Sequence, residues 1–192
     1  MNSYLDFALE TERLSIRAWR LEDTEAAFEM YSDPEVAEYL TGVPEESLES
    51  QRVYLSRIID AYSKLNAGMG SFPLIEKASG DLVGAVLLKP LPRSEHIDAW
   101  RAFREDPTAI PPIHEIEIGW HLAKSHWGKG FATESATRML DYGFSELGLK
   151  EIYAVLYSGN RRSKGVVRRL EMRHLGSTEK FYGVELEHYV TP

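Results

Sequence analysis

Residues 117–134, with the sequence EIGWHLAKSHWGKGFATE, contain a strand, a glycine turn and the start of a helix. A strand is predicted over His114–Leu122, because apolar side chains alternate there with others, as in a half-buried strand. A helix is predicted over Phe131–Leu147, because its apolar residues recur at helical spacing. A strand that passes through a glycine turn into an amphipathic helix indicates a protein with mixed α/β architecture.

The turn between these elements has the features of an anion-binding site. Gly128 and Gly130 allow a sharp turn and a close approach to a ligand. The helix that follows begins with free N–H groups at the positive end of its dipole. Lys129 adds a positive charge and Thr133 adds a hydroxyl. Such a cradle is suited to a pyrophosphate.

Three other known patterns do not fit this turn. The P-loop requires Ser or Thr after its Gly-Lys pair, whereas Gly130 follows Lys129. The dinucleotide-binding fingerprint requires a third glycine where Thr133 stands. Residues 129–132 match the first half of an RNA-recognition octamer, but Thr133 and Glu134 break the second half.

The rest of the chain predicts further strands and helices of one sheet. A hairpin is predicted at residues 78–81, and Asp33 is predicted to cap a helix that has Pro34 in its first turn. The predicted strands are Glu12–Trp19, Ser71–Glu76, Leu82–Lys89, Glu151–Leu156, Leu175–Phe181 and Glu185–Val190. The other predicted helices begin at Asp23 or cover Glu45–Ala67 and Arg161–Leu170. The order is strand, helices, three strands, helix, strand, helix, two strands. It predicts an α/β (α+β mixed sheet) fold in a single domain over residues 1–192.

An insertion separates two of the predicted strands, at about residues 90–113. It contains five prolines and a short helical segment around Ile97–Phe103. Loops of this length are often functional lids or mobile segments, and a flexible loop without a function is the alternative. Trp100 in the insertion is a candidate for covering an acceptor pocket, and ordinary core or surface packing is the alternative.

Composition excludes several classes of protein. The chain has 192 residues, 43% of them hydrophobic, and no cysteine. A chain of this size can bury a core without disulfides, and it has no thiolate to act as nucleophile or metal ligand. The N-terminal residues lack the pattern of a signal peptide, and no apolar run reaches the length of a membrane span. We therefore expect a cytoplasmic protein that does not interact with membranes.

Charge is distributed unevenly along the chain. The net charge is −8, which argues against a general nucleic-acid partner. Residues 124–173 nevertheless contain 10 basic and 5 acidic residues. A local basic zone in an acidic protein favours a small anionic ligand, although a solvated helix face would give the same count.

These motifs together resemble the GNAT acyltransferase superfamily, and within it the RimJ/RimL-type N-acetyltransferases. Residues 117–122 followed by 127–134 resemble the central strand and cofactor turn of the family. Residues 14–17 followed by Asp23 resemble its opening strand and helix, and residues 160–170 resemble its second cofactor motif. The resemblance covers roughly residues 12–190, except for the insertion.

The resemblance implies acetyl transfer from acetyl-CoA to a primary amine. His114, His121 and His126 lie close in the sequence, but the lack of an HExxH pairing and of cysteine argues against a metal site. It implies that a turn holds the CoA pyrophosphate and that a splayed strand pairs with pantetheine. The cofactor-binding residues implied in this way are Trp120, His121, Leu122, Ala123, Trp127, Gly128, Lys129, Gly130, Phe131, Ala132, Thr133, Asn160 and Ser163.

Amine acetylation needs a base, because an ammonium must lose a proton before it attacks a thioester. Glu117 lies closest to the usual carboxylate position of the family and is the first candidate; Glu115 is the second. Two neighbouring carboxylates could raise each other's pKa, which would suit a base. His114 and His121 are further candidates for the base, and ordinary solvated strand residues are the alternative. A backbone N–H near Leu122 would meet the oxyanion.

The sequence departs from the family pattern at three positions. Val167 stands where many members have the tyrosine that protonates the leaving thiolate, which leaves Tyr157, Ser158 or water as candidate acids. Glu171 replaces the glycine after the second-motif helix, where a left-handed cap would cost about 1 kcal/mol. Trp127 replaces a common Arg or Gln but is normal for the resembled subgroup.

The sequence thus predicts an N-acetyltransferase with a peptide, amino acid or small amine as acceptor. A catalytically impaired CoA-binding or protein-interaction module is the alternative function, and an RNA-binding protein is a third. Variable loops at residues 31–48 and 90–114 are expected to shape the acceptor pocket. The final strands could pair across a homodimer.

Overall fold

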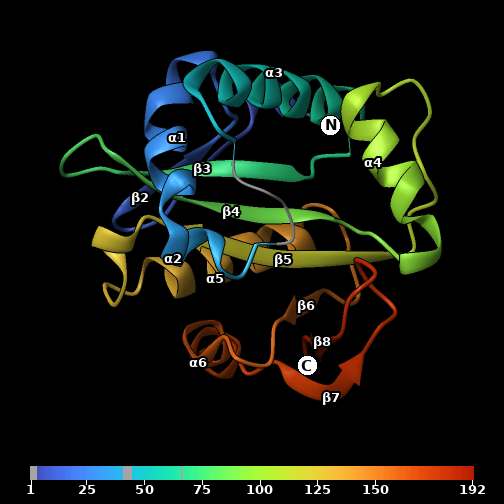
Figure 1. The fold of residues 1–192 in the computed structure, drawn as a ribbon. Helices are drawn as coiled ribbons and strands as arrows, with labels where there is room; N and C mark the ends of the chain where they lie inside the picture. Colours follow the sequence, from blue (N-terminus) through green and yellow to red (C-terminus); the bar gives the residue numbers. More distant parts are fainter. Residues whose placement is uncertain (1–3, 41–44, 66) are drawn as a thin grey trace.

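The computed structural model describes residues 4–40, 45–65 and 67–192 and forms one eight-stranded mixed sheet (Figure 1). The strand order is β1-β2-β3-β4-β5-β6-β8-β7. The strands are β1 (Ala8–Glu10), β2 (Leu14–Arg17), β3 (Gly70–Glu76), β4 (Leu82–Leu91), β5 (Glu115–Leu122), β6 (Tyr153–Leu156), β7 (Arg173–Thr178) and β8 (Leu186–Val190). The helices are α1 (Thr24–Ser32), α2 (Pro34–Ala37), α3 (Leu48–Leu65), α4 (Ile97–Glu105), α5 (Phe131–Ser145) and α6 (Arg161–Arg169).

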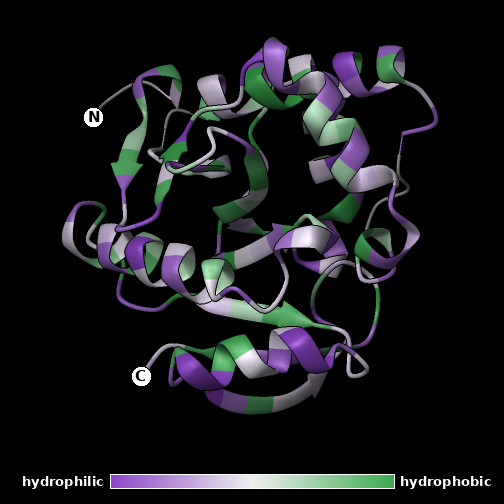
Figure 2. Ribbon diagram, turned by 90° about the vertical axis from the view of Figure 1, so that its left-hand side faces the viewer, coloured by the Kyte–Doolittle hydropathy of each residue, from purple (hydrophilic) through white to green (hydrophobic). Residues whose placement is uncertain are grey.

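The helices cover both faces of the sheet. In Figure 1, α1 and α3 lie above the strands, and α5 lies below them against β4 and β5. A cluster that includes Phe72, Ile118 and Met139 fills the main core, and a second cluster around Trp19 and Leu55 lies beneath α1 and α3. Figure 2 shows that the central strands are largely hydrophobic, whereas the helices alternate between hydrophilic and hydrophobic turns. The centre of the sheet is therefore buried on both faces, and a ligand there needs a gap between the elements.

The predicted fold class and the order of the elements are confirmed. Asp33 caps α2, because its Oδ1 accepts a hydrogen bond from the N–H of Glu35 at 2.8 Å. The antiparallel hairpin of β3 and β4 forms as predicted. Residues 41–44, within the predicted loop 31–48, and residue 66, within the predicted helix Glu45–Ala67, lie outside the described residues, as do residues 1–3.

Several boundaries differ from the predictions by a few residues, and three differences have a clear physical cause. The short strand β1 was not predicted, because three residues are too few to show a period of two. Strand β4 extends to Leu91, into the predicted insertion, and is followed by α4. Strand β7 begins at Arg173 rather than Leu175, because a strand at the edge of the sheet keeps polar side chains exposed and so lacks an apolar pattern.

Helix α6 ends in a left-handed cap at Glu171, which has φ of 56°. The N–H of Met172 donates to the carbonyl of Val167 at 3.0 Å, and the N–H of Glu171 donates to that of Arg168 at 3.2 Å. These two bonds define a Schellman motif, whose left-handed position strongly favours glycine.

Replacing Glu171 with glycine is therefore expected to raise the free energy of unfolding by about 1 kcal/mol. Urea denaturation of the variant and its parent would measure this gain. Glu171→Ala is the matched control, because it removes the carboxylate but keeps the strained backbone; an equal gain in the alanine variant would contradict the explanation.

Candidate active site

Strands β5 and β6 separate in the middle of the sheet. Strand β5 pairs with β4 along its whole length, from Glu115 to Leu122. Its parallel pairing with β6 is limited to Glu117 opposite Tyr153. The predicted splay after this point is therefore present, and it opens the sheet beside residues 118–122.

The glycine turn lines a cavity of about 650 Å³ next to this opening. Gly128 and Gly130 have φ of 78° and 86°, so the turn depends on glycine at both positions. Helix α5 starts directly after Gly130. Arg161, Arg162 and Arg169 from the α6 side also line this cavity. A positive helix end that faces three guanidinium groups is suited to a phosphorylated ligand.

Most of the predicted cofactor-binding residues come together here. The cavity is lined by Trp120, His121, Leu122, Trp127, Gly128, Gly130, Ala132, Thr133, Asn160 and Ser163. Ala123, Lys129 and Phe131 are not among its described lining residues. Phe131 is buried in the core, and the N–H of Ala123 donates to the carbonyl of Val83 at 3.0 Å. Phe131 and Ala123 therefore anchor the two ends of the turn segment, whereas Lys129 is exposed.

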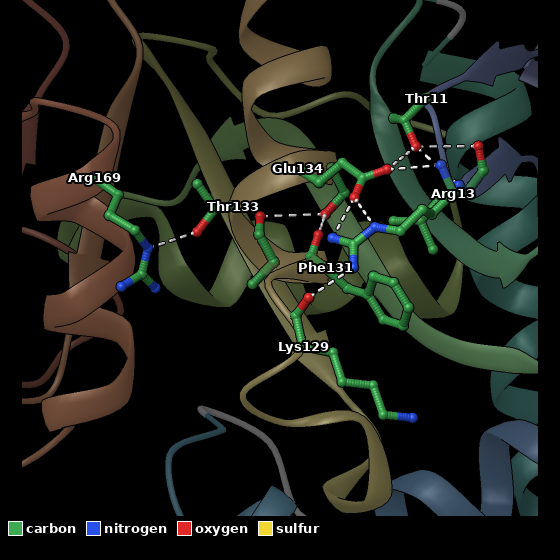
Figure 3. A network of polar contacts seen from close by, with 10 residues as sticks. Thr11, Arg13, Lys129, Phe131, Thr133, Glu134 and Arg169 are labelled. Atoms are coloured by element: carbon green, nitrogen blue, oxygen red, sulfur yellow. Dashed lines mark hydrogen bonds and ion pairs between the residues drawn. The ribbon is translucent and has the colours of Figure 1, made fainter.

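A polar network fixes the turn to the sheet (Figure 3). The guanidinium of Arg13 donates to the carbonyl of Lys129 at 2.9 Å and to the carboxylate of Glu134 at 2.7 Å. It also lies 4.6 Å from the ring centroid of Phe131. Burial raises the pKa of Glu134, but hydrogen bonds from Thr11 and Arg13 outweigh it and lower that pKa below its ordinary value. Arg13 and Glu134 were missing from the predicted site.

The other side of the cavity is tied to β5 by two tryptophans. Trp127 Nε1 donates to the carbonyl of Leu122 at 2.9 Å, and the guanidinium of Arg162 lies 4.1 Å from the Trp127 ring. Trp120 Nε1 donates to Ser163 Oγ at 3.3 Å. Asn160 caps α6, because its Oδ1 accepts from the N–H of Ser163 at 3.0 Å.

A second cavity, of about 280 Å³, adjoins the first and is lined in part by α3. The two cavities share lining residues, among them Trp120, His121 and Asn160. The second cavity is rich in aromatic walls, which come from Trp19, Tyr31, Tyr39, Tyr54, Tyr62, Trp120, Tyr157 and Tyr182. The two cavities are therefore neighbours.

Glu117 is the buried carboxylate of the second cavity. Its side chain is 8% exposed, and its Oε1 lies 2.7 Å from the ammonium of Lys89. The Tyr182 hydroxyl also donates to Oε1 and itself accepts from Lys89 at 2.8 Å. Among the described residues, Oε2 has no hydrogen-bond partner. The carboxylate is thus held through one oxygen, and the other is available to a ligand.

The partners of Glu117 keep their protons. Burial lowers the pKa of Lys89, but the charge of Glu117 outweighs it and raises that pKa above its usual value. Burial, and then the charge of Glu117, raise the pKa of Tyr182. Lys89 is therefore a cation and Tyr182 a neutral donor at neutral pH.

Tyr182 reaches this position from a strained turn between β7 and β8. Its φ is 59°, a conformation that is rare for residues other than glycine. The turn is bound to the segment after β4, since the N–H of Tyr182 donates to the carbonyl of Pro92 at 3.1 Å and the N–H of Ser94 donates to that of Lys180 at 2.8 Å. The backbone contacts offset the strain, which is a common arrangement at functional sites.

Glu115, the second candidate base, is occupied by other groups. Arg93 binds both of its oxygens, at 2.9 and 2.7 Å, and Lys180 lies 2.6 Å from Oε1. The hydrogen bonds from Arg93 have the largest effect on the pKa of Glu115. They lower it to about 2, although burial alone would raise it. It is not among the described residues that line either cavity. The prediction that the two carboxylates raise each other's pKa is therefore wrong for Glu115.

The low pKa of Glu115 makes its ion pairs a source of stability that depends on pH. A depressed pKa stabilises the fold above the pKa of the unfolded chain, and the contribution disappears as the pH falls through the folded value. Glu115→Gln is therefore expected to lower the unfolding free energy at pH 7, with a difference from the parent that shrinks between pH 4.5 and 2. Urea denaturation across this range measures the difference, and a constant value would contradict the assignment.

The histidines differ in environment. Burial, and then the charge of Lys89, lower the pKa of His121 to about 4, so His121 is neutral at pH 7. Its Nδ1 lies 3.2 Å from the Tyr31 hydroxyl. His114 stacks on His96 at 5.9 Å, away from the described cavity linings. His121 thus remains a candidate near the site, and His114 does not lie in it.

Three further candidates can be placed. Val167 is buried in the main core, so the usual tyrosine position does not face a ligand here. Tyr157 lines the second cavity, whereas Ser158 is not among its described lining residues. Trp100 packs against α3 and does not line the cavity among the described residues; Arg104, on the same helix, does.

Lys89 and Tyr182 were also missing from the predicted site. Lys89 had a signal, because it is the one charged residue in the otherwise apolar strand Leu82–Leu91. Tyr182 had no signal in the sequence, because it reaches the site only through the turn between β7 and β8. Across the described ranges, no cluster of side chains could hold a metal ion, and no helix is long and apolar enough to cross a membrane.

Comparisons with known proteins agree with this geometry. Residues 13–173 match the family model of the acetyltransferase (GNAT) domain. The N-acetyltransferase YnaD of Bacillus subtilis is 30% identical over 174 residues, which cover 90% of this chain and 86% of YnaD. The crystal structure of a GNAT-family acetyltransferase from Bacillus anthracis has a TM-score of 0.71 at 25% identity and covers 96% of this chain and 97% of its own. RimL, a ribosomal L7/L12 α-N-protein acetyltransferase in complex with coenzyme A, shares the fold with a TM-score of 0.72 at 14% identity; the match covers 96% of this chain and 97% of RimL.

Proposed function

The chain belongs to the GNAT family of acetyl-CoA-dependent acetyltransferases, and from this we propose that it acetylates a primary amine with Glu117 as the proton acceptor. The observation that carries the proposal is the position of Glu117. Its side chain is buried in the aromatic cavity, and that cavity shares lining residues with the one beside the glycine turn. The acceptor class comprises peptide N-termini, amino acids and small amines.

The cavity beside the glycine turn fits the cofactor. We propose that the turn and the start of α5, residues 127–133, hold the pyrophosphate through backbone N–H groups, and that Asn160 and Ser163 flank the pantetheine arm beside Trp120. Acetyl-CoA supplies the thioester carbonyl that an amine attacks. Trp127 holds the peptide of Leu122 through its carbonyl, which orients the backbone at the position proposed to meet the oxyanion.

Glu117 would accept the proton of the ammonium through Oε2. A carboxylate within hydrogen-bond reach can act as the base for an amine, and this contributes about 100- to 10,000-fold to a rate. Lys89 and Tyr182 hold Oε1 and so fix the direction in which Oε2 points. Because they touch Glu117 rather than the proposed acceptor, they are positioning residues.

The absence of the usual tyrosine does not require a different function. A thiol has an ordinary pKa of about 8.5, so a thiolate is a good leaving group without a general acid. Tyr157 lines the cavity and remains the candidate for protonating it later.

The alternative is a module that binds CoA without catalysis. The ion pair between Lys89 and Glu117 favours this alternative, because it occupies one oxygen of the proposed base. We further propose that residues 1–192 act as one domain, since a single sheet links the first strand to the last.

A screen of amines with the purified protein and acetyl-CoA tests the proposed function. Release of free thiol that depends on an amine, together with mass spectrometry of the acetylated product, is the expected result. Binding of acetyl-CoA without transfer to any peptide N-terminus, amino acid or small amine would support the binding module instead.

A further inference from the structure

One arginine, Arg104 on α4, lines the aromatic cavity from the insertion. We infer that the acceptor is an apolar amino acid, whose carboxylate binds Arg104 while its amine faces Glu117. This inference rests on the proposed function and specifies the substrate of the same site.

Arg104 differs from the other cation of this cavity in having no ion pair among the described residues. Lys89 also lines the cavity, but it is paired with Glu117. Arg104 has no ion pair within the described ranges, even though Glu45 lines the same cavity. An arginine presents a planar fork of donors that matches a carboxylate, so an unpaired guanidinium beside a ligand cavity favours an anionic group on the ligand.

Packing holds α4 in place. Trp100 and Phe103 are 8% and 3% exposed and belong to a cluster with Ala61 and Leu65 of α3. Their rings meet edge to face, with centroids 5.8 Å apart. The next residue along the helix is Arg104, so its backbone is anchored beside the cavity while its side chain remains free to meet a ligand.

The location of Arg104 separates it from the proposed phosphate site. In Figure 1, α4 lies at one end of the sheet, and the gold segment that leads into the glycine turn lies at the other. The cations that line the cavity beside the turn are Arg161, Arg162 and Arg169. Arg104 is therefore placed to meet the acceptor rather than the cofactor.

The size and walls of the cavity limit the rest of the acceptor. Its volume of about 280 Å³ suits a small molecule. Its walls include Leu55, Ile58 and Tyr62, which favour an acceptor with an apolar side chain. A primary amine and a carboxylate on one α-carbon that also carries an apolar side chain describe a free amino acid such as leucine or phenylalanine.

The test compares amines that differ only by a carboxylate. Phenylalanine is paired with phenethylamine, and leucine with 3-methylbutylamine. For each acceptor, kcat/KM is measured with acetyl-CoA and the full-length protein. The expected result is a preference of about tenfold or more for the amino acids, the effect of one charge-assisted hydrogen bond. Arg104→Gln is expected to abolish this preference by slowing the amino acids alone.

Arg101→Gln is the matched control, because Arg101 lies on the same helix but is paired with Asp98 at 3.1 Å, outside the described cavity lining. It is expected to keep the preference. Equal rates with amino acids and plain amines would overturn the inference and leave the proposed function standing.

Binding is measured in parallel, by calorimetric titration of phenylalanine into the CoA-loaded protein. Binding that Arg104→Gln weakens about tenfold, without acetyl transfer, would support the inference and contradict the proposed function. No binding, or equal binding to the parent and to Arg104→Gln, would overturn the inference even where no acceptor is acetylated.

Discussion

Replacing Glu117 with glutamine is expected to lower kcat/KM by about 100- to 10,000-fold, the usual contribution of a general base. Glutamine keeps the shape of the side chain and an acceptor for Tyr182, but it cannot take a proton from the acceptor amine. The affinity for CoA is expected to remain unchanged, because the proposed pyrophosphate site lies at the glycine turn. Steady-state kinetics and calorimetric titration of CoA provide the two measurements.

Glu115→Gln is the matched control for this prediction. It changes a carboxylate two residues away on the same strand, where Arg93 and Lys180 bind it outside the described cavity linings. Its activity is expected to stay within about threefold of the parent, as for a residue that does not touch the substrate. Loss of activity in both variants, or in neither, would remove Glu117 as the base.

The Glu117 variant also leaves Lys89 without its ion pair. Breaking a buried pair costs about 3–5 kcal/mol, so thermal unfolding must confirm that the variant is folded under assay conditions. The double variant Glu117→Gln/Lys89→Gln removes both charges and is expected to be more stable than the single variant. It is expected to remain inactive, which separates the loss of the base from the loss of stability.

Replacing Gly130 with valine is expected to weaken CoA binding by about 100-fold, the equivalent of one or two hydrogen bonds to a charged group. Gly130 has φ of 86°, which strains any residue with a β-carbon, and a Cβ there would lie 3.4 Å from a guanidinium nitrogen of Arg13. The added side chain would also stand where the backbone is proposed to approach the pyrophosphate. Calorimetry with CoA measures the effect.

Gly80→Val is the matched control for the glycine turn. Gly80 has φ of 80° in the turn between β3 and β4, and a Cβ there would meet no atom of the described residues within 4 Å. It therefore carries the same backbone strain without the proposed contact. A similar loss of CoA affinity in both variants would show that lowered stability, rather than the cradle, is responsible.

The sequence-based prediction of the fold depends on patterns between residues that are close in the chain. The alternation of residues 115–122 and the glycine turn with its following helix are signals between neighbours in the chain, and they located β5 and α5 within two residues. The predictions are less accurate for strands at the edge of the sheet. Strand β7 is exposed and polar, so its first residues have no apolar period to reveal them.

The candidate site was predictable only where its residues lie on these local elements. The glycine turn and Glu117 follow from the motif. Three further residues of the site come from distant segments of the chain, namely Lys89, Tyr182 and Arg13. The register of the sheet and the turn between β7 and β8 bring them to the site. The same register explains why Glu115 is bound by other groups. It places Glu115 opposite Leu91, near Arg93, which binds the carboxylate.

A crystal structure of the protein with CoA would test the central proposal most directly, namely that one continuous cavity joins a cofactor cradle to Glu117. The expected result places the pyrophosphate on the backbone N–H groups of residues 127–133 and the sulfur in the gap between β5 and β6, facing Glu117. CoA bound elsewhere, or a sulfur on the face of the sheet away from Glu117, would contradict the proposal.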